Sequence, residues 1–309
     1  MLRYILCLAG LLLLGCGQDR AVAPEPASAP AVYEAQTLSE AEDEDDESER
    51  ILSHCLSILD RLPCSVDLDG DGTMEKLDLV TYTEEDGYPR WAIVLTAGEE
   101  EKRFETEIPC DMPHDLWVGD LDEDGAYEIF FHGDMASDDY LIFGFRHDLA
   151  PLLFEPDERA ARWGGDQIDS VFAGAIEGFE DGHIVIEGAV DMLGTHWGVR
   201  NYALGDDGII GPVSTVWTFD EEVEADRPLT VARELTAYKA SVRRDPGEAF
   251  LLESGEKIIP LASDGCSRLW FATEKGKNGV LLLTPDEDAS WLIDGVPEAD
   301  CFADLPYSG

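Results

Sequence analysis

Short apolar segments, separated by polar and glycine-containing turns, dominate the chain after residue 76. Residues 77–82 and 91–95 are two such segments, and an acidic turn that ends in glycine lies between them at 85–87. Because side chains of a strand point alternately to its two faces, this arrangement predicts an antiparallel hairpin. Residues 129–131 and 140–145 predict a second pair of strands of the same kind.

The strand pattern continues to the C-terminus. Residues 171–176 and 183–186 flank the turn Asp181-Gly182 and predict a third hairpin. Beyond residue 226, five further segments read as strands: 235–238, 248–252, 256–261, 268–273 and 279–283. Five short strands in succession are typical of a small barrel. The sequence therefore predicts a mostly β chain, with a β-domain at 50–225 and a small β-barrel domain at 226–309.

One segment has helical rather than strand periodicity. Apolar side chains recur every three or four positions before Pro63: Ile51, Leu52, Cys55, Ile58, Leu59 and Leu62. This spacing places them on one face of a helix, and a proline ends such a run. We expect a short N-terminal amphipathic helix that packs on the strands following it.

The N-terminus of the chain has the features of an export signal. Arg3 precedes an apolar run that is too short to cross a bilayer as a helix. The run ends at residues 13–16, Leu-Leu-Gly-Cys, which resemble the bacterial lipobox. The resemblance implies a signal peptide at 1–15, a lipid on Cys16 and a position on the extracytoplasmic face of a cell membrane. The alternative is an ordinary signal peptide with an unmodified cysteine.

Residues 16–49 differ in composition from everything that follows. They are rich in alanine, proline and acidic residues, and the acidic residues are densest between 40 and 49. Such a segment has too few apolar side chains to pack, and its charges repel one another. We expect a disordered acidic tether that holds the folded part clear of the membrane.

The charge balance restricts the partners of the protein. Acidic residues outnumber basic residues by 67 to 21, which gives a formal net charge of -46. Nucleic acids and anionic membrane surfaces would be repelled, because binding either needs lysine and arginine. Metal cations and cationic partners remain favoured, and the same charge also keeps an exported protein soluble.

The cysteines allow two kinds of covalent or metal cross-link. Five of them follow the signal region: Cys55, Cys64, Cys110, Cys266 and Cys301. In an exported protein their spacing suggests the disulfides Cys64–Cys110 and Cys266–Cys301, with Cys55 left over. A zinc site at His54, Cys55 and Cys64 is the alternative, although the paired cysteine spacing typical of zinc sites is missing.

Two acidic loops share one pattern and carry the clearest chemistry. Residues 67–75 read Asp-Leu-Asp-Gly-Asp-Gly-Thr-Met-Glu, and residues 120–128 read Asp-Leu-Asp-Glu-Asp-Gly-Ala-Tyr-Glu. Carboxylates at positions 1, 3 and 5, a glycine at 6 and a backbone carbonyl at 7 form the type of oxygen cage that Ca²⁺ prefers. The predicted calcium ligands are Asp67, Asp69, Asp71, Thr73 and Glu75, and Asp120, Asp122, Asp124, Ala126 and Glu128.

The closing ligand distinguishes these loops from an EF-hand. An EF-hand takes its last ligand from position 12 and continues into a helix. Position 12 is Asp78 in the first loop but Phe131 in the second, whereas position 9 is glutamate in both. We therefore expect each cage to close at Glu75 or Glu128, and each loop to lead directly into a strand.

The loops and their flanking strands, at 66–80 and 118–131, resemble FG-GAP/VCBS repeats. These are the calcium-loop hairpins of integrin-type propeller blades and of many bacterial surface proteins. The family usually has aspartate at position 9, where this chain has glutamate. The chain is too short for seven blades, so the resemblance implies a few-bladed propeller-like unit or a compact β-domain. Residues 255–260, 264–265 and 276–280 weakly resemble Src-homology-three-like barrels of bacterial surface proteins.

No catalytic motif accompanies these features. The sequence contains no nucleophile elbow, zinc-protease motif or phosphate-binding loop. We expect His114, His132 and His196 to be structural, and the tryptophans Trp163, Trp197, Trp217, Trp270 and Trp291 to pack in a core rather than line a groove. The sequence favours a non-enzymatic, lipid-anchored calcium-binding module that contacts cell-wall glycan or a surface protein. The alternatives are a secreted envelope or glycan hydrolase with structural calcium, and a sensor or accessory subunit.

Overall fold

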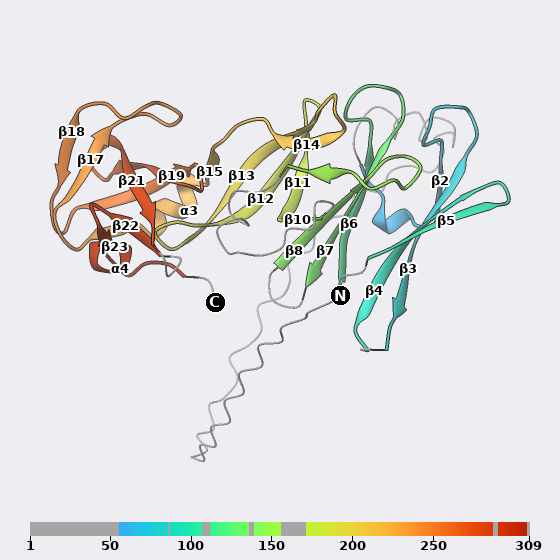
Figure 1. Cartoon of the computed structure of the whole chain (residues 1–309), viewed down its shortest axis with the longest axis horizontal. Helices are drawn as coiled ribbons and strands as arrows, with labels where there is room; N and C mark the ends of the chain where they lie inside the picture. Colours follow the sequence, from blue (N-terminus) through green and yellow to red (C-terminus); the bar gives the residue numbers. More distant parts are fainter. Residues whose placement is uncertain are drawn as a thin grey trace, which may run out of the picture. The chain divides into compact units, whose positions relative to one another are not determined.

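A computed structural model describes residues 56–85, 87–106, 112–135, 139–155, 171–286 and 290–307 (Figure 1). The signal peptide, Cys16 and the tether lie outside these residues. Strands dominate the described part, and they form sheets of four, five and fifteen strands. The prediction of a mostly β chain is therefore confirmed. Within the described part, no helix is long and apolar enough to cross a membrane.

The first predicted hairpin is the centre of the four-stranded sheet. This sheet has the order β2 (Cys64–Val66), β3 (Glu75–Thr83), β4 (Pro89–Ala97) and β5 (Glu100–Glu105). Each neighbouring pair is antiparallel. Leu77 and Ile93 are fully buried, as the alternating pattern requires for one face of a half-buried sheet.

The second predicted hairpin belongs to the five-stranded sheet. Its order is β1 (Leu56–Ser57), β6 (Met112–Gly119), β7 (Glu128–Met135), β8 (Asp139–Phe145) and β10 (Val171–Ala173). One hydrophobic core contains residues of this sheet and of the four-stranded sheet, among them Leu77, Ile93, Ile129 and Phe131. Burial of each such side chain stabilises the fold by roughly 2 kcal/mol, so this shared core holds the two sheets together.

The fifteen-stranded sheet contains the remaining strands. Its main path is β11 (Ala175–Glu180), β12 (His183–Asp191), β13 (Thr195–Leu204), β15 (Trp217–Phe219), β19 (Lys257–Ser263), β20 (Arg268–Thr273), β21 (Asn278–Pro285), β17 (Leu235–Lys239) and β18 (Ala249–Leu252). Shorter strands pair beside this path: β9 (Leu153–Phe154), β14 (Ile209–Pro212), β16 (Leu229–Val231), β22 (Trp291–Ile293), β23 (Val296–Pro297) and β24 (Phe302–Ala303).

The five strands predicted after residue 226 are present as β17 to β21, but the predicted barrel is not. None of the sheets closes on itself. The reason is visible in the pairing of β19, whose Ser263 and Ala262 lie opposite Trp217 and Thr218 of β15. Because β15 also pairs with β13, the C-terminal strands continue an existing sheet and do not close one of their own.

The predicted N-terminal helix is wrong over the part that the structure describes. Leu56 and Ser57 form β1, which pairs with β6, and the Ile58 amide donates a hydrogen bond to the Leu116 carbonyl at 2.7 Å. A short 3₁₀ helix, η1 (Leu59–Arg61), follows. The edge of β6 needs backbone partners, and pairing with it outweighs the helical spacing of the apolar side chains.

One predicted disulfide is also wrong. Cys301 lies at the end of the short helix α4 (Glu298–Cys301), where it is buried and carries a free thiol, whereas Cys266 is exposed. Burial raises the pKa of the Cys301 thiol, which disfavours the reactive thiolate. Cys64 also carries a free thiol, and its predicted partner Cys110 lies outside the described residues, as do His54 and Cys55 of the alternative zinc site.

Candidate metal centre

Both acidic loops are hairpin turns between antiparallel strands. The first connects β2 to β3, and the second connects β6 to β7. In each loop the glutamate at position 9 begins the second strand and lies opposite the last residue of the first: Glu75 opposite Val66, and Glu128 opposite Gly119. Phe131 at position 12 is fully buried in the core. The prediction that each loop leads directly into a strand is confirmed.

The aspartates at position 1 close both loops in the same way. The Gly72 amide donates to Asp67 Oδ2 at 2.9 Å, and the Gly125 amide donates to Asp120 Oδ2 at 3.0 Å. Both glycines have φ near +87°, at 86° and 88°, a conformation that glycine adopts without steric cost. The sharp turn expected at position 6 is therefore present in both loops.

The aspartates at positions 3 and 5 also turn toward the loop backbone. In the first loop, Asp69 Oδ1 accepts from the Asp71 amide at 3.1 Å, and Asp71 Oδ1 accepts from the Thr73 amide at 2.6 Å. Hydrogen bonds from the side chain and the amide of Thr73 lower the pKa of Asp71, so this carboxylate stays ionised. Both side chains are exposed, and each accepts a hydrogen bond from the backbone of the turn.

The second loop repeats these contacts. Asp122 Oδ1 accepts from the Asp124 amide at 3.3 Å, and Asp124 Oδ1 accepts from the Ala126 amide at 2.8 Å. The Asp124 amide also donates to Asp120 Oδ1 at 3.1 Å. Two loops of different sequence therefore share one geometry, which their common positions 1, 3, 5 and 6 dictate.

The glutamates at position 9 are buried against the backbone of their own loops. Glu75 Oε2 accepts from the Leu68 amide at 2.8 Å, and Glu128 Oε2 accepts from the Leu121 amide at 2.8 Å. Glu75 is 7% exposed and Glu128 is 1% exposed. Burial, together with the smaller effect of the loop aspartate charges, raises the pKa of Glu128 to about 7, against the effect of the Leu121 amide.

The carboxylates meet closely enough to bind a cation. One carboxylate oxygen from each of Asp67, Asp69 and Asp71 lies within 4.8 Å of the other two, and the same holds for Asp120, Asp122 and Glu128. Among the described residues, Asp67 Oδ1 is buried and has no hydrogen-bond partner. Such an atom normally has a partner, and a bound cation would supply one. These two groups of carboxylates could therefore hold a metal ion, although the predicted ligands Glu75 and Asp124 lie outside them.

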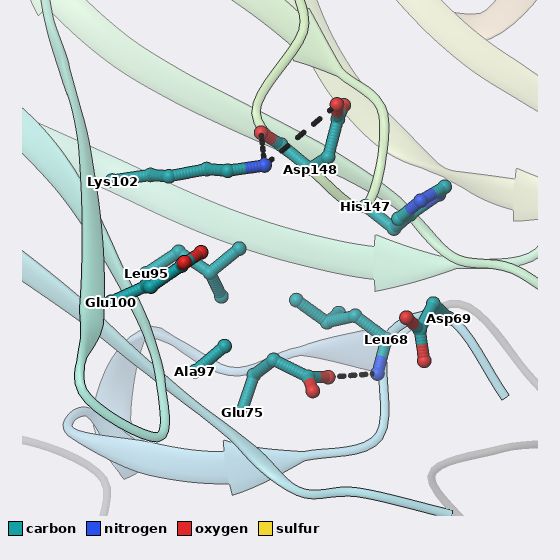
Figure 2. Close-up of a pocket in the computed structure, with 9 residues that line it drawn as sticks. All are labelled: Leu68, Asp69, Glu75, Leu95, Ala97, Glu100, Lys102, His147 and Asp148. Carbon is teal, nitrogen blue, oxygen red and sulfur yellow. Dashed lines mark hydrogen bonds and ion pairs between the residues drawn. The ribbon is translucent and has the colours of Figure 1, made fainter. Parts of the chain in front are cut away.

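A small cavity opens beside the first loop (Figure 2). It has a volume of about 130 Å³ and is lined by Leu68, Asp69, Glu75, Leu95, Ala97, Glu100, Lys102, His147 and Asp148. Figure 2 shows Lys102 directed at Asp148, with its Nζ 3.3 Å from the carbonyl oxygen and 3.9 Å from the carboxylate. No serine, threonine or cysteine lines the cavity, so it offers no hydroxyl or thiol nucleophile.

Most of the histidines and tryptophans that were predicted to be structural are buried in the described part of the chain. His196 is fully buried, with Nδ1 2.9 Å from Glu224 Oε2 and Nε2 3.2 Å from the Leu193 carbonyl. His114 and His132 stack on each other, with ring centroids 5.2 Å apart. Core packing is confirmed for three tryptophans, Trp217, Trp270 and Trp291. Trp197 is only half-buried, and Trp163 lies outside the described residues.

The loops also contact each other, a feature that sequence reasoning missed. The Tyr127 amide, at position 8 of the second loop, donates to the Leu68 carbonyl, at position 2 of the first, at 2.7 Å. Both side chains belong to the core that the two smaller sheets share. The apolar residues at positions 2 and 8 were the available signal, but a repeat read along the chain does not show which loops become neighbours.

Comparison with known proteins found no relative of this chain. No protein-family model matches the chain, no curated protein matches it, and no solved structure matches it.

Proposed function

We propose that this protein is an exported, lipid-anchored surface protein whose β-domain is stabilised by bound calcium. In this proposal it acts as a non-enzymatic binding or adhesion module. The observation that carries the proposal is the shared geometry of the two acidic loops. Each folds its position 1 aspartate onto the glycine at position 6. Each also brings three carboxylates together at a hairpin turn.

Calcium is the cation that this chemistry favours. The donors are carboxylate and carbonyl oxygens, which suit hard cations and not the softer metals that histidine and cysteine bind. The loops resemble FG-GAP/VCBS hairpins, which implies the same ion. Because the ligands of each cage come from one turn between two paired strands, the ion would hold that turn and both strand ends.

The partner of such a module would lie in the cell envelope. The proposed signal and Cys16 lipid would place the β-domain outside the cytoplasm, and the strong negative charge disfavours nucleic acid. Cell-wall glycan or a second surface protein are the partners we propose.

The test of the calcium role is thermal unfolding of the purified protein with calcium and with excess chelator. A ligand that binds only the folded state at a hundredfold its Kd adds roughly 2.7 kcal/mol. We therefore expect chelation to lower Tm by roughly 5–10 °C for each occupied loop. The double variant Asp69→Ala, Asp122→Ala should lose this response.

A matched control is Asp207→Ala, which removes an aspartate from the turn between β13 and β14. The Asp207 carboxylate accepts from the Ile209 amide at 3.1 Å, but it belongs to neither close carboxylate group. This variant should keep the full response to calcium. An unchanged melting curve of the parent protein under chelation would exclude a structural role for calcium.

A further inference from the structure

We infer that the two acidic loops form one coupled centre, in which calcium bound at one loop strengthens calcium binding at the other. This inference rests on the proposed calcium function and adds a regulatory property to it. Its basis is the direct contact between the loops, together with the buried Asp67 Oδ1, which has no hydrogen-bond partner and is an atom that a cation bound in the first loop would contact.

The backbone of Leu68 connects the position 9 ligand of one loop to the other loop. Its amide donates to Glu75 Oε2 at 2.8 Å, and its carbonyl accepts from the Tyr127 amide at 2.7 Å. Tyr127 directly precedes Glu128, whose carboxylate is held by the amide of Leu121. A movement of Glu75 toward a cation therefore shifts the peptide to which the second loop is bonded.

A second contact lies at Gly70, position 4 of the first loop. A Cβ added there would lie 2.8 Å from the carbonyl oxygen of Gly125, which is closer than such atoms can approach. The left-handed backbone does not by itself require glycine, because Glu123 occupies position 4 of the second loop with φ 58°, against 69° for Gly70. Glycine is needed in the first loop because the second loop lies against it.

These contacts favour positive coupling. Eight carboxylates belong to the two predicted cages, and without a cation their repulsion loosens both turns. A cation in one cage orders its turn, and the Leu68–Tyr127 bond and the Gly70–Gly125 contact then pre-position the turn of the other. Part of the entropic cost of ordering the second loop has then already been offset, so the second ion binds more tightly. Mutual repulsion of the two cations opposes this effect, and the residual negative charge of each cage weakens that repulsion.

The coupling is measured by titrating metal-free protein with calcium alone in a calorimeter. The product of the two binding constants of the parent protein is divided by the product of the single-loop constants. The latter come from Asp122→Ala, which retains the first loop, and Asp69→Ala, which retains the second. Independent loops give a ratio of one, and we expect a ratio of about five or more.

A pair of glycine variants isolates the contact. Gly70→Ala and Gly72→Ala both place alanine at a positive φ in the first loop, at 69° and 86°, but only the Gly70 variant meets the second loop. Both should weaken the first loop. The ratio should fall to about one in Gly70→Ala and keep its parent value in Gly72→Ala. Neither variant changes charge, so the charge removed by the aspartate variants affects both ratios equally.

The outcomes separate this inference from the proposed function. Two ions bound with a ratio of one, or equal ratios in the two glycine variants, would overturn the coupling and leave the calcium function standing. Absence of calcium binding would overturn both. Near-ultraviolet circular dichroism shows whether Gly70→Ala folds. If it does not, the ratio of binding constants of the parent protein at 1 M salt decides whether the loops are coupled. The screening length there is about 3 Å, so a ratio that stays above one cannot arise from charge.

Discussion

Glu224 is a buried carboxylate that a histidine and an arginine hold in place. His196 Nδ1 lies 2.9 Å from its Oε2, and Arg227 donates to its Oε1 at 2.5 Å. Burial alone would raise the pKa of Glu224, but hydrogen bonds and charge from His196 and Arg227 together lower it. The ionised carboxylate is therefore the form that the fold stabilises.

The sign of the pH dependence follows from that lowered pKa. The stability that Glu224 contributes is present above its ordinary value near 4.5 and is lost as pH falls through the lower folded value. Glu224→Gln should reduce the free energy of unfolding by about 3 kcal/mol at pH 7, because it removes the buried carboxylate charge that pairs with Arg227 and accepts from His196. The difference from the parent should shrink below pH 4.

Denaturant unfolding at pH 7 and pH 3.5 measures this effect. The matched control is Glu222→Gln. It makes the same chemical change in the helix that contains Glu224, α3 (Glu221–Asp226), but on an exposed side chain. It should change the free energy of unfolding by less than about 0.5 kcal/mol at either pH. A loss in Glu224→Gln that is equally large at both pH values would show that the ionised carboxylate is not what stabilises the fold.

At the scale of elements, the helix α3 (Glu221–Asp226) depends on a single cap to present Glu224 to the core. The Asp220 carboxylate accepts from the amides of Glu222 and Val223 at 2.8 and 3.2 Å. Asp220→Ala should lower the free energy of unfolding by about 1 kcal/mol. Asp220→Asn keeps an acceptor at the same atom and should retain most of the stability. Equal losses in urea unfolding would mean that the negative charge, and not the hydrogen bonds, stabilises the helix.

Strands were predictable from the sequence wherever one face is buried. In β12, every second side chain is buried, and Ile184, Ile186 and Val190 are among these buried residues. Apolar residues at this spacing predict a strand with one buried face. The segment before Pro63 failed for a related reason. Apolar residues at helical spacing there suit a helix, but the unpaired edge of β6 takes residues 56–57 as a strand partner. That edge becomes visible only when the sheet is assembled.

The acidic loops were predictable in shape but not in their relation to each other. Positions 1, 3, 5 and 6 determine the turn locally, so both loops could be described from residue types alone. The position 9 glutamates were expected only as closing ligands, and their bonds to Leu68 and Leu121 were not foreseen. The bond from Tyr127 to Leu68 depends on how two sheets share a core, which no local pattern encodes.

At the scale of the whole molecule, sheet closure was the feature beyond reach of the sequence. Five consecutive short strands are typical of a barrel, but β19 pairs with β15. The five strands therefore extend the sheet to which β15 belongs. The choice between closing and extending a sheet is decided by a strand that precedes the five. Counting strands within one segment therefore predicts their number but not the topology that they enter.

Net charge restricts the ways in which the whole chain could be held at the proposed membrane. With a formal charge of -46, the protein gains no electrostatic attraction to an anionic bilayer, so retention there would depend on the lipid proposed on Cys16. Cys16→Ser should move the protein from the membrane fraction to the soluble fraction, as read by immunoblot. Cys7→Ser removes a thiol within the same apolar run and should leave it with the membrane.

A salt wash separates lipid anchoring from adsorption. At 1 M salt the screening length is about 3 Å, so a protein held by charge through another component would be released. The parent protein and Cys7→Ser should both remain bound, because transfer of acyl chains into the bilayer depends on buried hydrocarbon. Release of the parent protein by salt, or retention of Cys16→Ser, would exclude Cys16 as the anchor. In that case a contact with another envelope component, and not a lipid, would hold this acidic chain at the membrane.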